Sequence, residues 1–132
     1  MIVVDASVLT TALSDDGPDG ERVRGRLADE VLAAPQVIDL EVTSVLRRLT
    51  LSGLLPERRA AQALEDLVEL PIQRAAHAPL LERCWQLRTD VTAYDAAYVA
   101  LAELLDVALL SGDQRLARAT GPRCTFELLT GS

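Results

Sequence analysis

The order of apolar segments along this 132-residue chain predicts an α/β fold: a three-layer α/β/α sandwich around a central, mainly parallel sheet. Two observations support this fold class. Short apolar runs of strand length alternate with longer segments whose apolar residues recur at helical spacing. The first run, Met1–Asp5, is apolar up to its final aspartate, which is typical of a strand buried on both faces of a parallel sheet.

The first quarter of the chain predicts two helices and a second strand. A helix is expected over Ala6–Leu13, and the DDGPDG sequence at Asp15–Gly20 is expected to form the turn that stops it. A second, arginine-rich helix is predicted over Glu21–Glu30. The short apolar segment Val31–Ala34 then predicts the second strand.

Two long helices follow in the middle of the chain. Pro35 is expected to open the first, and Gly53 marks its end. Its buried stripe is predicted to consist of Val42, Val45, Leu46 and Leu49. Pro56 stands where proline is tolerated, at the first turn of the next predicted helix, Glu57–Glu69.

The second half continues the alternation of strands and helices. A strand is predicted over Leu70–Arg74 and a helix over Leu80–Arg88. Thr92 can cap a helix that runs to Leu105, with four residues facing inward: Tyr98, Leu101, Ala102 and Leu105. The remaining predicted elements are a strand, a short helix and a last strand, at Val107–Leu110, Gln114–Ala119 and Thr125–Leu129. The length predicts a single domain, residues 1–132.

Composition excludes several classes of function. All 13 basic residues are arginine, so a Walker A nucleotide loop and a Schiff-base lysine are both excluded. The net charge of −7 disfavours a protein that only coats nucleic acid, and 3% aromatic residues are too few for a base-stacking platform. Acidic residues gathered at a metal site are compatible with the same negative charge.

Cysteine and histidine content points to a cytoplasmic protein without a zinc site. Cys84 and Cys124 lack CxxC spacing and are expected to be buried, reduced thiols. The presence of a single histidine, His77, argues against a site of histidine and cysteine ligands. No apolar run approaches the roughly 20 residues that span a membrane, and the N-terminus is expected to be a strand and helix, not a signal peptide.

Four acidic residues stand where a predicted strand ends or a predicted helix begins: Asp5, Glu41, Asp95 and Asp113. Because parallel α/β sheets bind ligands at the carboxyl ends of their strands, the fold can bring these distant residues together. Carboxylate oxygens are ligands for Mg²⁺ or Mn²⁺, and such ions act mostly on phosphates. The sequence therefore predicts a carboxylate cage for a divalent ion.

Other interpretations of the acids stay open at this point. Any one of them can be a helix cap or a solvated charge, and three further acids near element ends are second choices for the site: Asp39, Asp90 and Asp106. Among enzymes, a phosphoryl-transfer fold with an aspartate nucleophile is disfavoured, because Ser7 stands where the haloacid-dehalogenase type needs a second acid and the lysine is missing. A non-catalytic protein with structural acids is the alternative of another class.

Around these acids, four motifs occur in a characteristic order: Asp5-Ala6-Ser7, Glu41-Val42 with Leu46-Arg47-Arg48, Thr92-Ala93-Tyr94-Asp95-Ala96-Ala97-Tyr98, and Leu110-Ser111-Gly112-Asp113 with Arg115-Leu116. Together they resemble the PIN-domain nucleases, most closely the VapC-type toxins of bacterial toxin–antitoxin pairs. The resemblance spans nearly the whole chain and is most specific around Asp95. Ser111 departs from the threonine that is frequent in the last motif, but serine keeps the hydroxyl.

The resemblance implies a function and a set of site residues. Asp5, Glu41, Asp95 and Asp113 would hold Mg²⁺ or Mn²⁺, with Ser7 and Ser111 as supporting hydroxyls. It also implies an α/β/α sandwich, usually a homodimer, that cleaves structured RNA such as tRNA, rRNA or mRNA. A VapB-like antitoxin would neutralise it, and a catalytically silent PIN-like binding module is the alternative.

A mechanism and an RNA-binding surface are expected on the same basis. Asp5 and Asp95 are expected to be the main ligands, while Glu41 and Asp113 position the attacking water or a second ion. RNA phosphates are expected to contact arginines, with Arg47, Arg48, Arg115 and Arg118 as the main candidates and Arg22, Arg24 and Arg26 as further ones.

Overall fold

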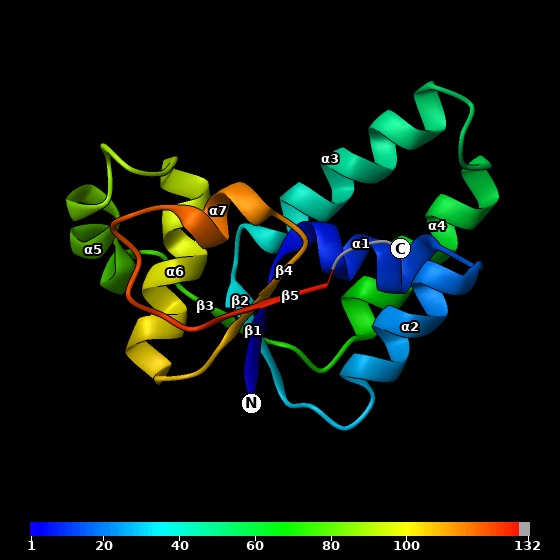
Figure 1. Ribbon diagram of the computed structural model, residues 1–132. Coiled ribbons are helices and arrows are strands. Elements are labelled where there is room, and N and C mark those ends of the chain that lie inside the picture. Colours follow the sequence, from blue (N-terminus) through cyan, green and yellow to red (C-terminus); the bar gives the residue numbers. More distant parts are fainter. Residues whose placement is uncertain (130–132) are drawn as a thin grey trace.

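The computed structural model describes residues 1–129 and has the predicted three-layer arrangement of a sheet between helices (Figure 1). The sheet has the strand order β3-β2-β1-β4-β5, and all four strand pairings are parallel. Its strands are β1 (Ile2–Val4), β2 (Leu32–Pro35), β3 (Gln73–Ala75), β4 (Leu109–Ser111) and β5 (Phe126–Leu128). The predicted α/β class and parallel sheet are confirmed.

Helices cover both faces of this sheet, as Figure 1 shows. One side carries α1 (Ala6–Ser14), α2 (Pro18–Leu27), α3 (Ile38–Leu51) and α4 (Glu57–Glu69). The other side carries a 3₁₀ turn (Ala78–Leu80), α5 (Leu81–Gln86), α6 (Ala93–Leu105) and the short α7 (Gln114–Arg118). The antiparallel pair α3 and α4 projects beyond the sheet.

Several predicted boundaries are wrong by one to three residues, and three of them have a clear local reason. Helix α2 begins at Pro18 instead of Glu21, because proline fits the first helical position. Pro35 does not open α3 but pairs with Ala75 as the last residue of β2. Leu70 is the C-cap of α4, with its N–H bonded to the Leu67 carbonyl, so β3 starts later than predicted.

The predicted helix ends and apolar stripes are mostly confirmed. Gly53 follows α3 with a φ of 78°, a left-handed conformation that favours glycine. Val42 and Leu46 are fully buried, while Val45 and Leu49 are half-buried. The inward placement of Leu105 is wrong, since this residue at the last turn of α6 is 38% exposed.

Helix α6 is the most enclosed helix and positions one side of the site. Seven consecutive residues, from Ala96 to Ala102, are buried between the sheet and α5, and four of them are alanines that allow a close approach. The first turn of α6 thereby lies near the carboxyl ends of β1 and β4, where parallel sheets bind ligands.

Neither cysteine forms a disulfide. Cys84 is buried and Cys124 is half-buried, so the expectation of two buried thiols holds for the first and only partly for the second. Within residues 1–129, no helix has the length and apolar character needed to cross a membrane.

Candidate functional site

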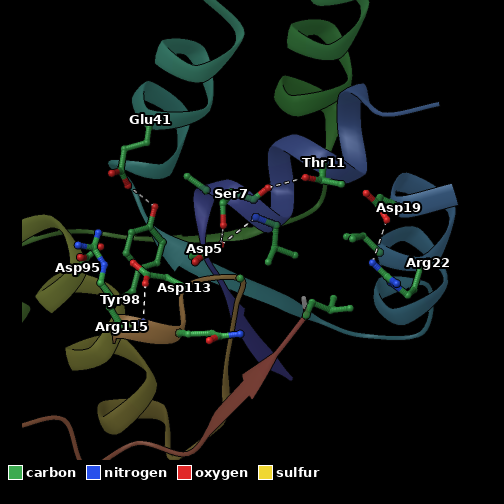
Figure 2. Close-up of a pocket in the computed structure, with 16 residues that line it drawn as sticks. Asp5, Ser7, Thr11, Asp19, Arg22, Glu41, Asp95, Tyr98, Asp113 and Arg115 are labelled. Atoms are coloured by element: carbon green, nitrogen blue, oxygen red, sulfur yellow. Dashed lines mark hydrogen bonds and ion pairs between the residues drawn. The ribbon is translucent and has the colours of Figure 1, made fainter. Parts of the chain in front are cut away.

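A pocket of about 750 Å³ opens where β1 and β4 end, and all four predicted acids line it. Figure 2 shows Asp5, Glu41, Asp95 and Asp113 around this pocket, each from a different segment of the chain. Ser7 also lines the pocket. Ser111 does not line it, but its hydroxyl donates a hydrogen bond to Asp5. We call this pocket, with its four acids, the acidic pocket.

Asp5 both caps a helix and faces the acidic pocket. It follows β1 in an extended conformation, and its Oδ1 accepts hydrogen bonds from the Val8 N–H at 3.0 Å and the Ser7 hydroxyl at 2.8 Å. Its Oδ2 accepts a hydrogen bond from the Ser111 hydroxyl at 2.5 Å. The helix-cap interpretation is therefore correct for Asp5 without removing it from the site, because three donors fix its carboxylate at the pocket wall.

Ser111 connects Asp5 to Asp113. Its side chain is fully buried, and its Oγ donates to Asp5 while accepting the Asp113 N–H at 3.0 Å. Asp113 in turn caps α7, because its Oδ1 accepts the N–H groups of Arg115 and Leu116. One hydroxyl thus sets the relative position of two acids that follow the neighbouring strands β1 and β4.

Replacement of Ser111 by alanine is expected to weaken the site more than replacement of Ser7. The Ser111→Ala variant leaves the Oδ2 atom of Asp5 without its donor, and groups that orient ligands typically contribute about 10–100-fold to metal affinity or activity. Ser7 is exposed, so water can replace its hydroxyl in the Ser7→Ala variant. Mn²⁺ affinities of the two variants check this order; equal affinities would contradict it.

Glu41 and Asp95 are partly buried, and the pKa values of both carboxyl groups are raised. Burial raises the pKa of Glu41, and the charges of Asp95 and Asp5 raise it further against the opposing effect of a Tyr98 hydrogen bond. Burial and the charge of Asp113 likewise raise the pKa of Asp95. Thr92 caps α6 as predicted, accepting the Asp95 N–H at 3.2 Å. The carboxylates therefore repel one another across the pocket, which a cation would relieve.

The donor set fits a hard divalent ion. Four carboxylates offer oxygen ligands, the kind that Mg²⁺ and Mn²⁺ prefer. Within residues 1–129, however, no three acidic, histidine or cysteine side chains are close enough to hold one ion as they stand. The acids therefore surround a common pocket without converging on one point, and an ion would have to draw their side chains inward.

The second-choice acids lie elsewhere. Asp39 forms an ion pair with Arg74 at 2.8 Å. Asp106 caps the far end of α6 with a φ of 54°. Asp90 lines a second groove, which shares Asp95, Asp113 and Arg115 with the acidic pocket.

The predicted arginines are dispersed. Arg115 lines both the acidic pocket and the second groove, and Arg22 lines the acidic pocket beside Asp19. Arg24 donates hydrogen bonds to the carbonyls of Ala12 and Asp15. Arg26 forms ion pairs with Glu30 and Glu127. The exposed side chains of Arg47, Arg48 and Arg118 line neither the pocket nor the groove.

Four polar residues of the acidic pocket were not predicted from the sequence: Thr11, Asp19, Tyr98 and Gln114. Tyr98 was predicted to be in the core, and its ring is there, but its hydroxyl donates to Glu41 at 2.6 Å. Its spacing of three residues from Asp95 was the available signal, because such residues share one helix face. Nothing in the pattern around Asp19 indicated a pocket residue.

Comparison with known proteins agrees with this geometry. The PIN domain family model matches residues 2–122. Ribonuclease VapC1 of Mycobacterium tuberculosis is 46% identical over 128 residues, covering 96% of each chain. Among solved structures, VapC20 of M. tuberculosis, described as a sarcin–ricin loop cleaving toxin, aligns with a TM-score of 0.70 at 16% identity, covering 93% of this chain and 99% of its own.

A toxin–antitoxin structure, VapBC2 from Rickettsia felis bound to a DNA fragment from its promoter, aligns with a TM-score of 0.69 at 14% identity, covering 97% of this chain and 98% of the other. At these identities the solved structures establish the fold alone, whereas the family model and the VapC1 sequence cover nearly the whole chain. The chain therefore belongs to the PIN-domain family, and its resemblance to VapC-type ribonucleases is confirmed.

Proposed function

We propose that this chain is a VapC-type toxin, a metal-dependent endoribonuclease that hydrolyses phosphodiester bonds in structured RNA such as tRNA, rRNA or mRNA. The observation that carries the proposal is the gathering of four acids from four segments around one pocket. The 46% identity to a protein named a ribonuclease supports the same reaction.

In the proposed site, Asp5 and Asp95 are the main ligands of Mg²⁺ or Mn²⁺, and Glu41 and Asp113 position the attacking water or a second ion. When bound, the ion would polarise a phosphoryl oxygen and make its bound water more acidic. The chain's own contribution is to hold the acids. Ser111 orients Asp5, and the first turn of α6 favours negative charge at Asp95.

We propose that the RNA strand passes Arg115 and continues into the second groove toward Arg88. Arg115 is exposed at the boundary between the acidic pocket and this groove. Arg88 lines the groove, with its guanidinium 4.4 Å from the centre of the Trp85 ring and its Nη1 bonded to the Trp85 carbonyl. Neither arginine forms an ion pair within residues 1–129, so both charges are available for phosphates.

Arg115→Ala and Arg88→Ala are expected to weaken RNA binding, whereas Arg118→Ala, on the same helix as Arg115 but outside the groove, is not. Each lost phosphate contact lowers the slope of log affinity against log salt by about 1. Fluorescence anisotropy with a short labelled RNA, in the Asp5→Asn background to prevent cleavage, measures this slope. Equal slopes for all three variants would reject the proposed path.

Two partners complete the proposal, a VapB-like antitoxin and a second copy of the chain. The homodimer is supported by three apolar side chains near the ends of α3 and α5 that are more than half exposed: Leu40, Leu81 and Trp85. A monomeric mass by light scattering at micromolar concentration would contradict the dimer.

We place the protein in the cytoplasm, where its free thiols would stay reduced.

Cleavage of total cellular RNA by the purified, partner-free protein tests the proposed function. Discrete fragments are expected with Mg²⁺ or Mn²⁺ and none with EDTA. Metal and RNA binding without cleavage would favour the alternative of a catalytically silent PIN-like module. Absence of both metal binding and cleavage would reject the proposed function.

A further inference from the structure

Tyr98 is a core residue whose hydroxyl reaches the acidic pocket. Its side chain is only 2% exposed, yet it lines the pocket with the four acids (Figure 2). It follows Asp95 by three positions on α6, so the two side chains lie on one helix face. This spacing carries the hydroxyl out of the apolar interior to the pocket wall.

The Tyr98 hydroxyl holds one oxygen of Glu41. It donates to Glu41 Oε1 at 2.6 Å and thereby connects α6 to α3, two helices that each contribute one acid. Within residues 1–129, no other group donates a hydrogen bond to the Glu41 side chain. The placement of this carboxylate therefore depends on one buried phenol.

A rigid donor is suited to this task. A free glutamate side chain samples many rotamers, and fixing it costs up to about 2 kcal/mol of conformational entropy. The ring of Tyr98 is already immobilised by the core, so its hydrogen bond orders Glu41 without ordering a second mobile side chain. Oε1 is engaged by the phenol, which leaves Oε2 for an ion or a water.

We propose that Tyr98 is a positioning residue that holds the Glu41 carboxylate ready to act on the divalent ion. The inference rests on the proposed function, because it assigns Glu41 a role at a bound metal. The two parts of the side chain then have separate roles, because the ring packs in the core and the hydroxyl orients Glu41. Removal of the hydroxyl alone should affect the metal site and leave the fold intact.

The Tyr98→Phe variant tests this separation, with Tyr94→Phe as its matched control. Tyr94 is on the same helix but is 62% exposed and lines a different pocket. Electron paramagnetic resonance of Mn²⁺ measures affinity directly. Tyr98→Phe is expected to weaken Mn²⁺ binding about 10-fold or more and to slow RNA cleavage, while the apo variant keeps the circular dichroism spectrum of the folded wild type. Tyr94→Phe is expected to behave as wild type.

A double-mutant cycle with Glu41→Gln distinguishes positioning from a general structural effect. The Glu41→Gln substitution keeps the size of the side chain and an oxygen that can accept from Tyr98, but it removes the carboxylate charge. In that background, Tyr98→Phe should cause little further loss of Mn²⁺ affinity. An equal loss in both backgrounds, or Mn²⁺ binding by Tyr98→Phe at wild-type affinity, would overturn the inference.

The controls also separate this inference from the proposed function. If the wild type neither binds Mn²⁺ nor cleaves RNA, the proposed function and the role of Tyr98 are both rejected. If the wild type does both and Tyr98→Phe matches it, only the role of Tyr98 is rejected.

Discussion

The Asp95→Asn variant is expected to lose RNA cleavage while keeping its fold. The substitution preserves size and the Thr92 cap but removes one of the charges that would hold the ion. Loss of one charge-stabilising group from a preorganised site typically lowers kcat by about 10²–10³-fold. Because Asp95 is repelled by Asp113 and Asp5, the apo variant should be as stable as the wild type or more so.

Asp106→Asn is the matched control for this experiment. It makes the same chemical change at the opposite end of α6, where asparagine tolerates the left-handed conformation of residue 106. Cleavage of total RNA in Mg²⁺ and thermal unfolding by circular dichroism are the two measurements. Wild-type cleavage by Asp95→Asn would remove this residue from the site, and equal losses in both variants would indicate a general defect.

The Glu103→Gln variant is expected to show the largest loss of stability without loss of cleavage. Glu103 accepts two hydrogen bonds from Arg83 and one from the Arg123 N–H at 2.7 Å, and the side chains of Arg83 and Glu103 are only 20% and 17% exposed. This cluster joins α5, α6 and the segment before β5. Since hydrogen bonds to charged groups contribute roughly 1.5–3 kcal/mol, a loss of about 2 kcal/mol is expected.

The pH dependence of this loss has a definite sign. Burial alone would raise the pKa of Glu103, but the hydrogen bonds from Arg83 and Arg123 outweigh it and lower the pKa below its ordinary value. The stabilisation is therefore fully present above the unfolded-state pKa of about 4.3 and disappears as pH falls through the folded-state value. Urea unfolding measures the free energies of unfolding of the wild type and of Glu103→Gln at neutral pH and at a pH below the folded-state pKa of Glu103. The difference between the two proteins should shrink in acid, and a difference that grows in acid would contradict this account.

Sequence patterns predicted the strands and helices because burial on both faces of a parallel sheet leaves a clear signal in short runs such as Met1–Asp5. One boundary was wrong because proline has two possible uses. Pro35 suits both a helix start and a strand end, and only its pairing with Ala75 decides between them. Leu105 is exposed in the last turn of α6, directly before the left-handed residue Asp106, and helical periodicity does not indicate where a helix ends.

The candidate site was predictable for the acids because each follows a strand or starts a helix, and the fold gathers such positions at one sheet edge. Tyr98 escaped prediction because a buried aromatic on a helix is normally core, and its hydroxyl acquires a role only through Glu41, 57 positions away. Arg88 and Arg115 could not be separated from the other arginines, since a groove is a property of the surface that sequence spacing does not describe.

The most direct test of the central claim is a calorimetric titration of Mn²⁺ into the purified wild type and into the Asp5→Asn, Asp95→Asn double variant. The four acids surround a pocket but do not converge without an ion, so binding should be saturable in the wild type and absent in the double variant. The Asp39→Asn, Asp106→Asn double variant should bind as the wild type, because both residues lie outside the acidic pocket. Equal binding by wild type and by the Asp5→Asn, Asp95→Asn variant, or no binding by either, would contradict a metal site built from these carboxylates.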